Sequence, residues 1–67
     1  MPSTFDYHAM RTKEYIEKAM MSYTLSGMAD NLDRAWSFAG MALDVSTSKK
    51  ERDFVSILIR RIERVNN

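Results

Sequence analysis

Three residues have types and spacings that could support chemistry: His8, the only histidine of the chain, and the aspartates Asp30 and Asp33. A histidine can act as a general base or accept a phosphoryl group when neighbouring side chains orient its ring. Two carboxylates three positions apart share a helix face, where they could hold a divalent cation or form an acid/base pair. Both patterns are also typical of ordinary structure, because His8 adjoins an apolar helix face and acids favour the N-terminal end of a helix.

No catalytic motif accompanies these residues. The 67-residue sequence has no cysteine, no glycine-rich phosphate loop, no histidine cluster of zinc spacing and no nucleophile elbow. We therefore expect that the protein is not an enzyme and that it holds no metal and no cofactor.

The C-terminal segment that begins at Lys49 places one apolar residue, Ile57, among cations. At about 100° per residue, one arc of this segment is apolar and the opposite arc is basic. The apolar arc contains Phe54, Val55, Leu58, Ile59, Ile62 and Val65. An exposed apolar residue surrounded by arginines suits the anchor and rim of a protein interface. The sequence therefore predicts a partner-binding patch made of Ile57, Lys50, Arg60, Arg61 and Arg64.

Two alternatives remain open for this patch. Ile57 could pack against a loop or the N-terminal tail, with the cations simply solvated. The basic segment could also bind nucleic acid, since residues 46–67 carry six bases and three acids. However, Asp53 falls at the centre of the basic face, and neither Gly27 nor Gly40 has the flanking residues of a helix-turn-helix unit. Recognition of a protein is the leading hypothesis, and a small nucleic-acid-binding regulator is the alternative.

The elements that position these residues are expected to be helices. Ser3 or Thr4 can cap the first helix, and Gly27 offers its C-terminal stop. Ser48 and Glu51 have the spacing of a capping box, which starts the last helix. No strand pattern competes with helical spacing. We predict three helices, over about residues 5–25, 29–43 and 49–65.

A chain of this length forms one domain and has a thin margin of stability, because it buries only about 60% of its unfolded surface. Three helices with short connections pack most simply as an antiparallel bundle, with the second helix between the other two. The predicted fold class is therefore all-α, a small three-helix bundle; a helical hairpin completed by a second copy is the alternative. The predicted core contains Leu32, Ala35, Trp36, Ala39, Leu43, Val55, Leu58, Ile62, Ile16 and Ala19.

Association is the remaining way to stabilise so small a chain without disulfides or metal. Met10 and Met21 fall on the charged side of the first helix, where adaptable methionines suit a partner. We predict a regulator or inhibitor that binds a partner protein and forms a homodimer. The lack of cysteine, of a signal-peptide-like run and of a bilayer-length apolar stretch favours a cytoplasmic protein with no membrane partner.

Overall fold

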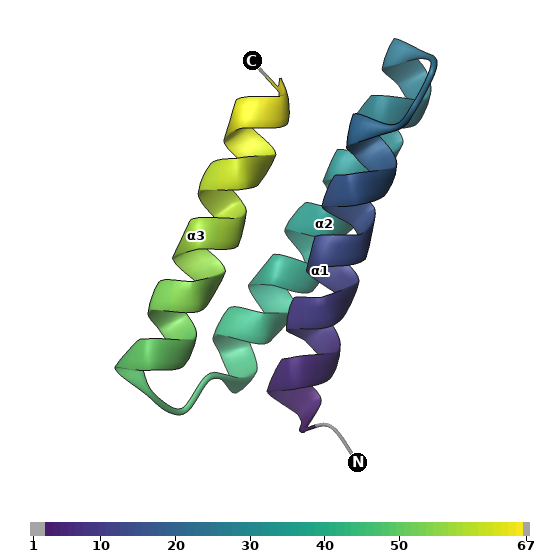
Figure 1. Cartoon of the computed structure of the whole chain (residues 1–67). Coiled ribbons are helices and arrows are strands. Elements are labelled where there is room, and N and C mark those ends of the chain that lie inside the picture. Colours follow the sequence, from purple (N-terminus) through teal and green to yellow (C-terminus); the bar gives the residue numbers. More distant parts are fainter. Residues whose placement is uncertain (1–2, 67) are drawn as a thin grey trace.

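The computed structural model describes residues 3–66, which form three α-helices. These are α1 (Thr4–Met20), α2 (Leu25–Val45) and α3 (Lys49–Asn66). Helices α1 and α3 run in the same direction and α2 runs opposite to both (Figure 1). Short connections join helices that lie next to each other. The predicted all-α three-helix bundle is confirmed, and the described residues contain no strand.

A hydroxyl side chain caps the start of each helix. The Asp6 N–H donates to Ser3 Oγ at 3.1 Å at the start of α1. At the start of α3, the Glu51 N–H donates to Ser48 Oγ at 3.2 Å, as the capping box predicts. The Glu51 carboxylate accepts from the Thr47 N–H at 2.8 Å, one residue earlier than a capping box requires. These caps satisfy backbone donors that have no partner within the helix.

The predicted boundary between the first two helices is wrong. Helix α1 ends at Met20 rather than at residue 25, and Gly27 lies in the first turn of α2. Thr24 has an extended backbone, and its Oγ1 accepts from the Gly27 N–H at 3.0 Å, so Thr24 is the cap that starts α2. Gly27 has no positive φ and therefore does not form the left-handed stop that the sequence suggested.

The core is narrow, because small residues of α2 meet larger residues of its two neighbours. Eight of the ten predicted core residues are buried. Trp36 and Leu43 are the exceptions, at 45% and 38% exposed. They lie at the edge of the wide apolar arc of α2, which α1 and α3 cover only along its alanine-rich centre. Buried residues absent from the predicted core are Phe5, Ala9, Thr12 and Ala42.

The bundle is flattened, with Cα extents of 36 × 24 × 14 Å. Helix α2 packs extensively on α1 and less on α3, while α1 and α3 make the smallest contact. The prediction that the second helix lies between the other two is therefore confirmed. The accessible surface is 4783 Å², compared with about 4,400 Å² for a typical monomer of 7.8 kDa. A groove remains between α1 and α3.

Candidate protein-binding groove

A hollow of about 1010 Å³, which we call the α1/α3 groove, lies between α1 and α3. The N-terminal halves of two parallel helices form its walls. Three large apolar side chains are about half exposed in it: Met10 at 49%, Phe54 at 42% and Ile57 at 56%. The complete lining is Phe5, Asp6, Ala9, Met10, Lys13, Ser48, Lys49, Lys50, Glu51, Asp53, Phe54 and Ile57.

The structure divides the predicted partner-binding patch between two hollows on the same flank of α3. Ile57 and Lys50 line the α1/α3 groove. Arg61 and Arg64 line a smaller hollow of about 170 Å³, together with Met20 and Val65. Arg60 is exposed and lines neither. The patch is therefore a strip along the α1/α3 flank rather than a single ring of cations around Ile57.

Ile57 is exposed rather than covered by a described loop. The loop residue nearest the groove, Ser48, contributes to its wall and leaves Ile57 at 56% exposure. The alternative that the N-terminal tail covers Ile57 concerns residues 1 and 2, which lie outside the described residues. Within residues 3–66, Ile57 therefore presents an apolar surface without a partner.

Sequence reasoning did not connect Met10 and Phe54 with this groove. Met10 was singled out as an apolar residue on a charged helix face, and Phe54 was placed in the apolar arc of α3. Both line the groove because α1 and α3 make only a small contact with each other. Met21, the other methionine on that face, lies in the α1–α2 connection and lines neither hollow.

The charges around the groove are partly neutralised. Lys49 pairs with Asp53 at 3.1 Å, although both side chains are largely exposed and such a pair contributes little stability. The Glu51 carboxylate is bound to the Thr47 backbone. Lys13 and Lys50 make no ion pair with any residue between 3 and 66. The groove therefore combines an apolar floor with three acids (Asp6, Glu51 and Asp53) and three bases (Lys13, Lys49 and Lys50).

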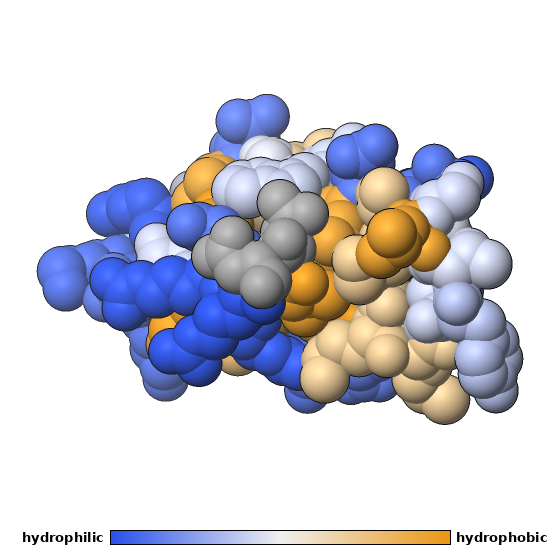
Figure 2. All heavy atoms as spheres, turned by 90° about the horizontal axis from the view of Figure 1, so that it is seen from above, coloured by the Kyte–Doolittle hydropathy of each residue, from blue (hydrophilic) through white to orange (hydrophobic). Residues whose placement is uncertain are grey.

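Figure 2 shows the end of the bundle that lies away from the α1/α3 groove, where the α1–α2 connection and the C-terminal end of α3 are found. Hydrophilic side chains cover the α3 side, on the left, whereas apolar side chains and weakly hydrophilic ones share the side of the α1–α2 connection, on the right. Met20, Met21, Tyr23 and Leu25 are all more than half exposed there. Tyr23 is fully exposed, because α1 ends at Met20 and Tyr23 lies in the connection that follows it.

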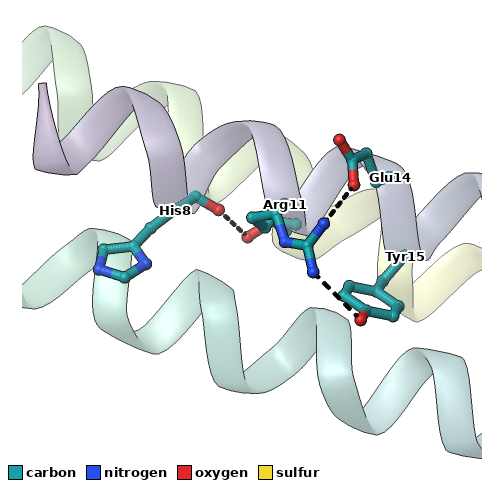
Figure 3. A network of polar contacts seen from close by, with 5 residues as sticks. His8, Arg11, Glu14 and Tyr15 are labelled. Carbon is teal, nitrogen blue, oxygen red and sulfur yellow. Dashed lines mark hydrogen bonds and ion pairs between the residues drawn. The ribbon is translucent and has the colours of Figure 1, made fainter. Parts of the chain in front are cut away.

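Aromatic rings and cations close the opposite seam, between α1 and α2. The Tyr15 and Phe38 rings stack with centroids 5.6 Å apart. The Arg11 guanidinium lies 5.4 Å from the Tyr15 ring centroid and pairs with Glu14 at 2.9 Å (Figure 3). Lys18 lies 4.8 Å from the same centroid. Such contacts stabilise the α1–α2 packing, because each ring attracts the cation above its face.

The three residues considered for chemistry are His8, Asp30 and Asp33. His8 is partly buried beside the rings of Tyr7 and Phe38, and its Nδ1 has no hydrogen-bond partner. Asp30 and Asp33 are exposed on α2. Among residues 3–66, no group of three histidine or acidic side chains is placed to hold a metal ion. No helix in the same range has the length and hydropathy needed to span a bilayer.

Comparison of the chain with models of protein families, with curated proteins and with solved structures finds no match.

Proposed function

We propose that this protein is a small, non-enzymatic interaction protein that regulates or inhibits a partner protein by binding it through the α1/α3 groove. The observation that carries the proposal is the convergence of Met10, Phe54 and Ile57 in one groove. Large apolar side chains gathered in a concave surface are typical of protein-binding sites.

The apolar side chains of the groove can supply only part of the binding free energy that a stable complex requires. Full burial of a Met, Phe or Ile side chain contributes roughly 1.5–3 kcal/mol, so three half-exposed side chains contribute about 3 kcal/mol. A dissociation constant in the micromolar range requires about 8 kcal/mol in addition to the cost of association. The apolar floor is therefore an anchor, and contacts with the charged and polar groups around it must supply the remainder.

Binding of nucleic acid is the alternative function. It is supported by α3, in which Lys50, Arg52, Arg60, Arg61 and Arg64 make no ion pair with any residue between 3 and 66. The exposed Ile57 and the carboxylates of Glu51 and Asp53 in the groove favour a protein instead, because neither apolar nor acidic groups attract phosphate.

The proposal is tested by capturing partners from the native host with immobilised protein and identifying them by mass spectrometry. We expect a protein that is retained by the wild type and lost with Ile57→Asp. Ser56→Asp is the matched control, since Ser56 is exposed on α3 and does not line the groove. Circular dichroism must show that both variants keep their helices. Retention of the same proteins by all three chains would exclude the groove as the binding site.

A further inference from the structure

Methionine supplies all the sulfur of this chain, which contains six methionines and no cysteine. A cysteine thiolate is the group that peroxides usually oxidise first, so in its absence the methionine thioether is the main target. The product, methionine sulfoxide, is a polar group in place of a flexible apolar one. Oxidation of an exposed methionine therefore changes the surface on which it lies.

The methionines differ in their surroundings. Met20, Met21 and Met41 are exposed at 62%, 78% and 39%, and none of them lines the α1/α3 groove. Met28 is partly buried and packs against the core. Met10 is 49% exposed and is the only methionine among residues 3–66 that lines the groove. Within this range, oxidation changes the lining of the groove at one position.

Met10 can be oxidised while the bundle stays folded. It lies outside the core, and its half-exposed side chain in an open groove can be reached by a molecule as small as hydrogen peroxide. A sulfoxide at Met28 would instead place a polar group against the core, which costs stability. Oxidation of Met10 therefore changes a binding surface and leaves the fold intact.

We infer that Met10 is an oxidation site whose sulfoxide closes the α1/α3 groove to its partner, an inference that rests on the proposed function of the groove. The thioether sulfur attacks one oxygen of hydrogen peroxide and forms an S–O bond. The O–O bond breaks, and the second oxygen takes up the proton of the first and leaves as water. The sulfur loses two electrons and the peroxide gains them. A methionine sulfoxide reductase reverses the change, because a dithiol is oxidised to a disulfide while the oxygen leaves as water.

The sulfoxide weakens binding because it adds a polar group to the apolar floor. Met10 lines the same groove as Phe54 and Ile57, and a ligand that covers all three must remove water from the sulfoxide oxygen. The apolar burial that the thioether would contribute is lost at the same time. We expect the affinity of the groove for an apolar ligand to fall about tenfold.

The inference is tested with anilinonaphthalene sulfonate, a dye that binds exposed apolar surface. Each chain is titrated with the dye before and after treatment with hydrogen peroxide, and peptide mass spectrometry locates the sulfoxides. The groove-bound dye is the part that is lost with Ile57→Asp. We expect peroxide to weaken this binding about tenfold in the wild type, and methionine sulfoxide reductases with a dithiol to restore it.

Two variants assign the effect to one sulfur. Met10→Leu should bind the dye equally before and after peroxide, when compared with its own untreated sample. Met21→Leu is the matched control, because Met21 is more exposed but lies outside the groove, and it should lose binding as the wild type does. Circular dichroism must show that the treated chains keep their helices.

Any of five outcomes would overturn the inference: a Met10 sulfur that stays a thioether while Met20 and Met21 are oxidised, dye binding unchanged by the sulfoxide at Met10, an equal loss in Met10→Leu, loss of helices on oxidation of Met10, or no groove-bound dye in the untreated chain. The capture experiment tests the proposed function separately. A protein retained by the untreated wild type and lost with Ile57→Asp would leave that function standing even if Met10 did not respond to peroxide.

Discussion

Met10 and Ile57 line the same groove from different helices, and each is about half exposed. Each is an apolar residue on the charged side of its own helix, so neither contributes to the core of the bundle. The proposed protein-binding surface would account for both exceptions.

Met10→Asp is therefore expected to abolish partner binding as completely as Ile57→Asp. The free energy of unfolding should fall by less than about 1 kcal/mol, since an exposed helical position loses mainly helix propensity. Binding to the captured partner and urea denaturation measure the two effects. Met21→Asp is the control, because Met21 is exposed outside the groove. Equal loss of binding with Met10→Asp and Met21→Asp would show that the groove has no special role.

The fold class and most of the core could be predicted from helical periodicity. The boundary between α1 and α2 could not, because two signals competed there. Gly27 suggests the end of the first helix, whereas Thr24, three residues earlier, is the residue that caps the start of α2. A threonine caps a helix when its side chain accepts a hydrogen bond from a backbone N–H two or three residues later. A glycine stop requires a positive φ, which Gly27 does not adopt.

The buried Thr12 shows why an apolar arc is an incomplete guide to the core. It is fully buried, yet its hydroxyl donates to the His8 carbonyl oxygen at 2.8 Å within the same helix (Figure 3). A hydroxyl satisfied in this way can lie in an apolar environment at little cost. The position of Thr12 on the inner face was visible in the spacing, but its chemical type excluded it from the predicted core.

The candidate site was predictable only in part. Periodicity identified Ile57 as an exception, but the opposite wall depends on which residues of α1 lie beside α3. Their placement follows from the packing of both helices on α2, which contacts α1 more extensively than α3. Sequence spacing within one helix contains no information about such a placement.

Gly40→Ala should raise the free energy of unfolding by roughly 0.5–1 kcal/mol, because alanine restricts the unfolded chain and its methyl group meets no neighbour. Gly27→Ala should not stabilise, since its Cβ would lie 3.0 Å from Thr24 Oγ1, the capping atom of α2. Thermal unfolding of both variants measures the effect. A greater gain from Gly27→Ala than from Gly40→Ala would contradict the described packing.

Ser48→Ala should lower the free energy of unfolding by about 1 kcal/mol, because the Glu51 N–H loses its capping acceptor. Ser56→Ala should change it by less than about 0.5 kcal/mol, since the Ser56 hydroxyl bonds only a carbonyl of its own helix. Urea denaturation of the two variants compares a capping serine with an interior one. Equal effects would show that α3 does not depend on this cap.

Ile62→Ala should unfold the domain or cost about 2–5 kcal/mol, because Ile62 is fully buried between the helices and its removal leaves a cavity. A chain of this size has little stability to lose. Ile57→Ala should cost less than about 1 kcal/mol, because its side chain is more than half exposed. Thermal denaturation distinguishes the two isoleucines, and a large loss with Ile57→Ala would place Ile57 in the core.

Nucleic acid should not bind with measurable affinity even at low salt. Lys49 is paired with Asp53, and the carboxylates of Glu51 and Asp53 lie in the same groove as Lys50. Fluorescence polarisation with a labelled DNA duplex and a labelled single-stranded RNA measures the affinity as salt increases. If the five cations of α3 without an ion pair all contacted a DNA duplex, the logarithm of the affinity would fall with a slope of about −4 to −5 against the logarithm of salt concentration. A slope of that size would favour the nucleic-acid alternative, because it would show that these cations neutralise phosphates.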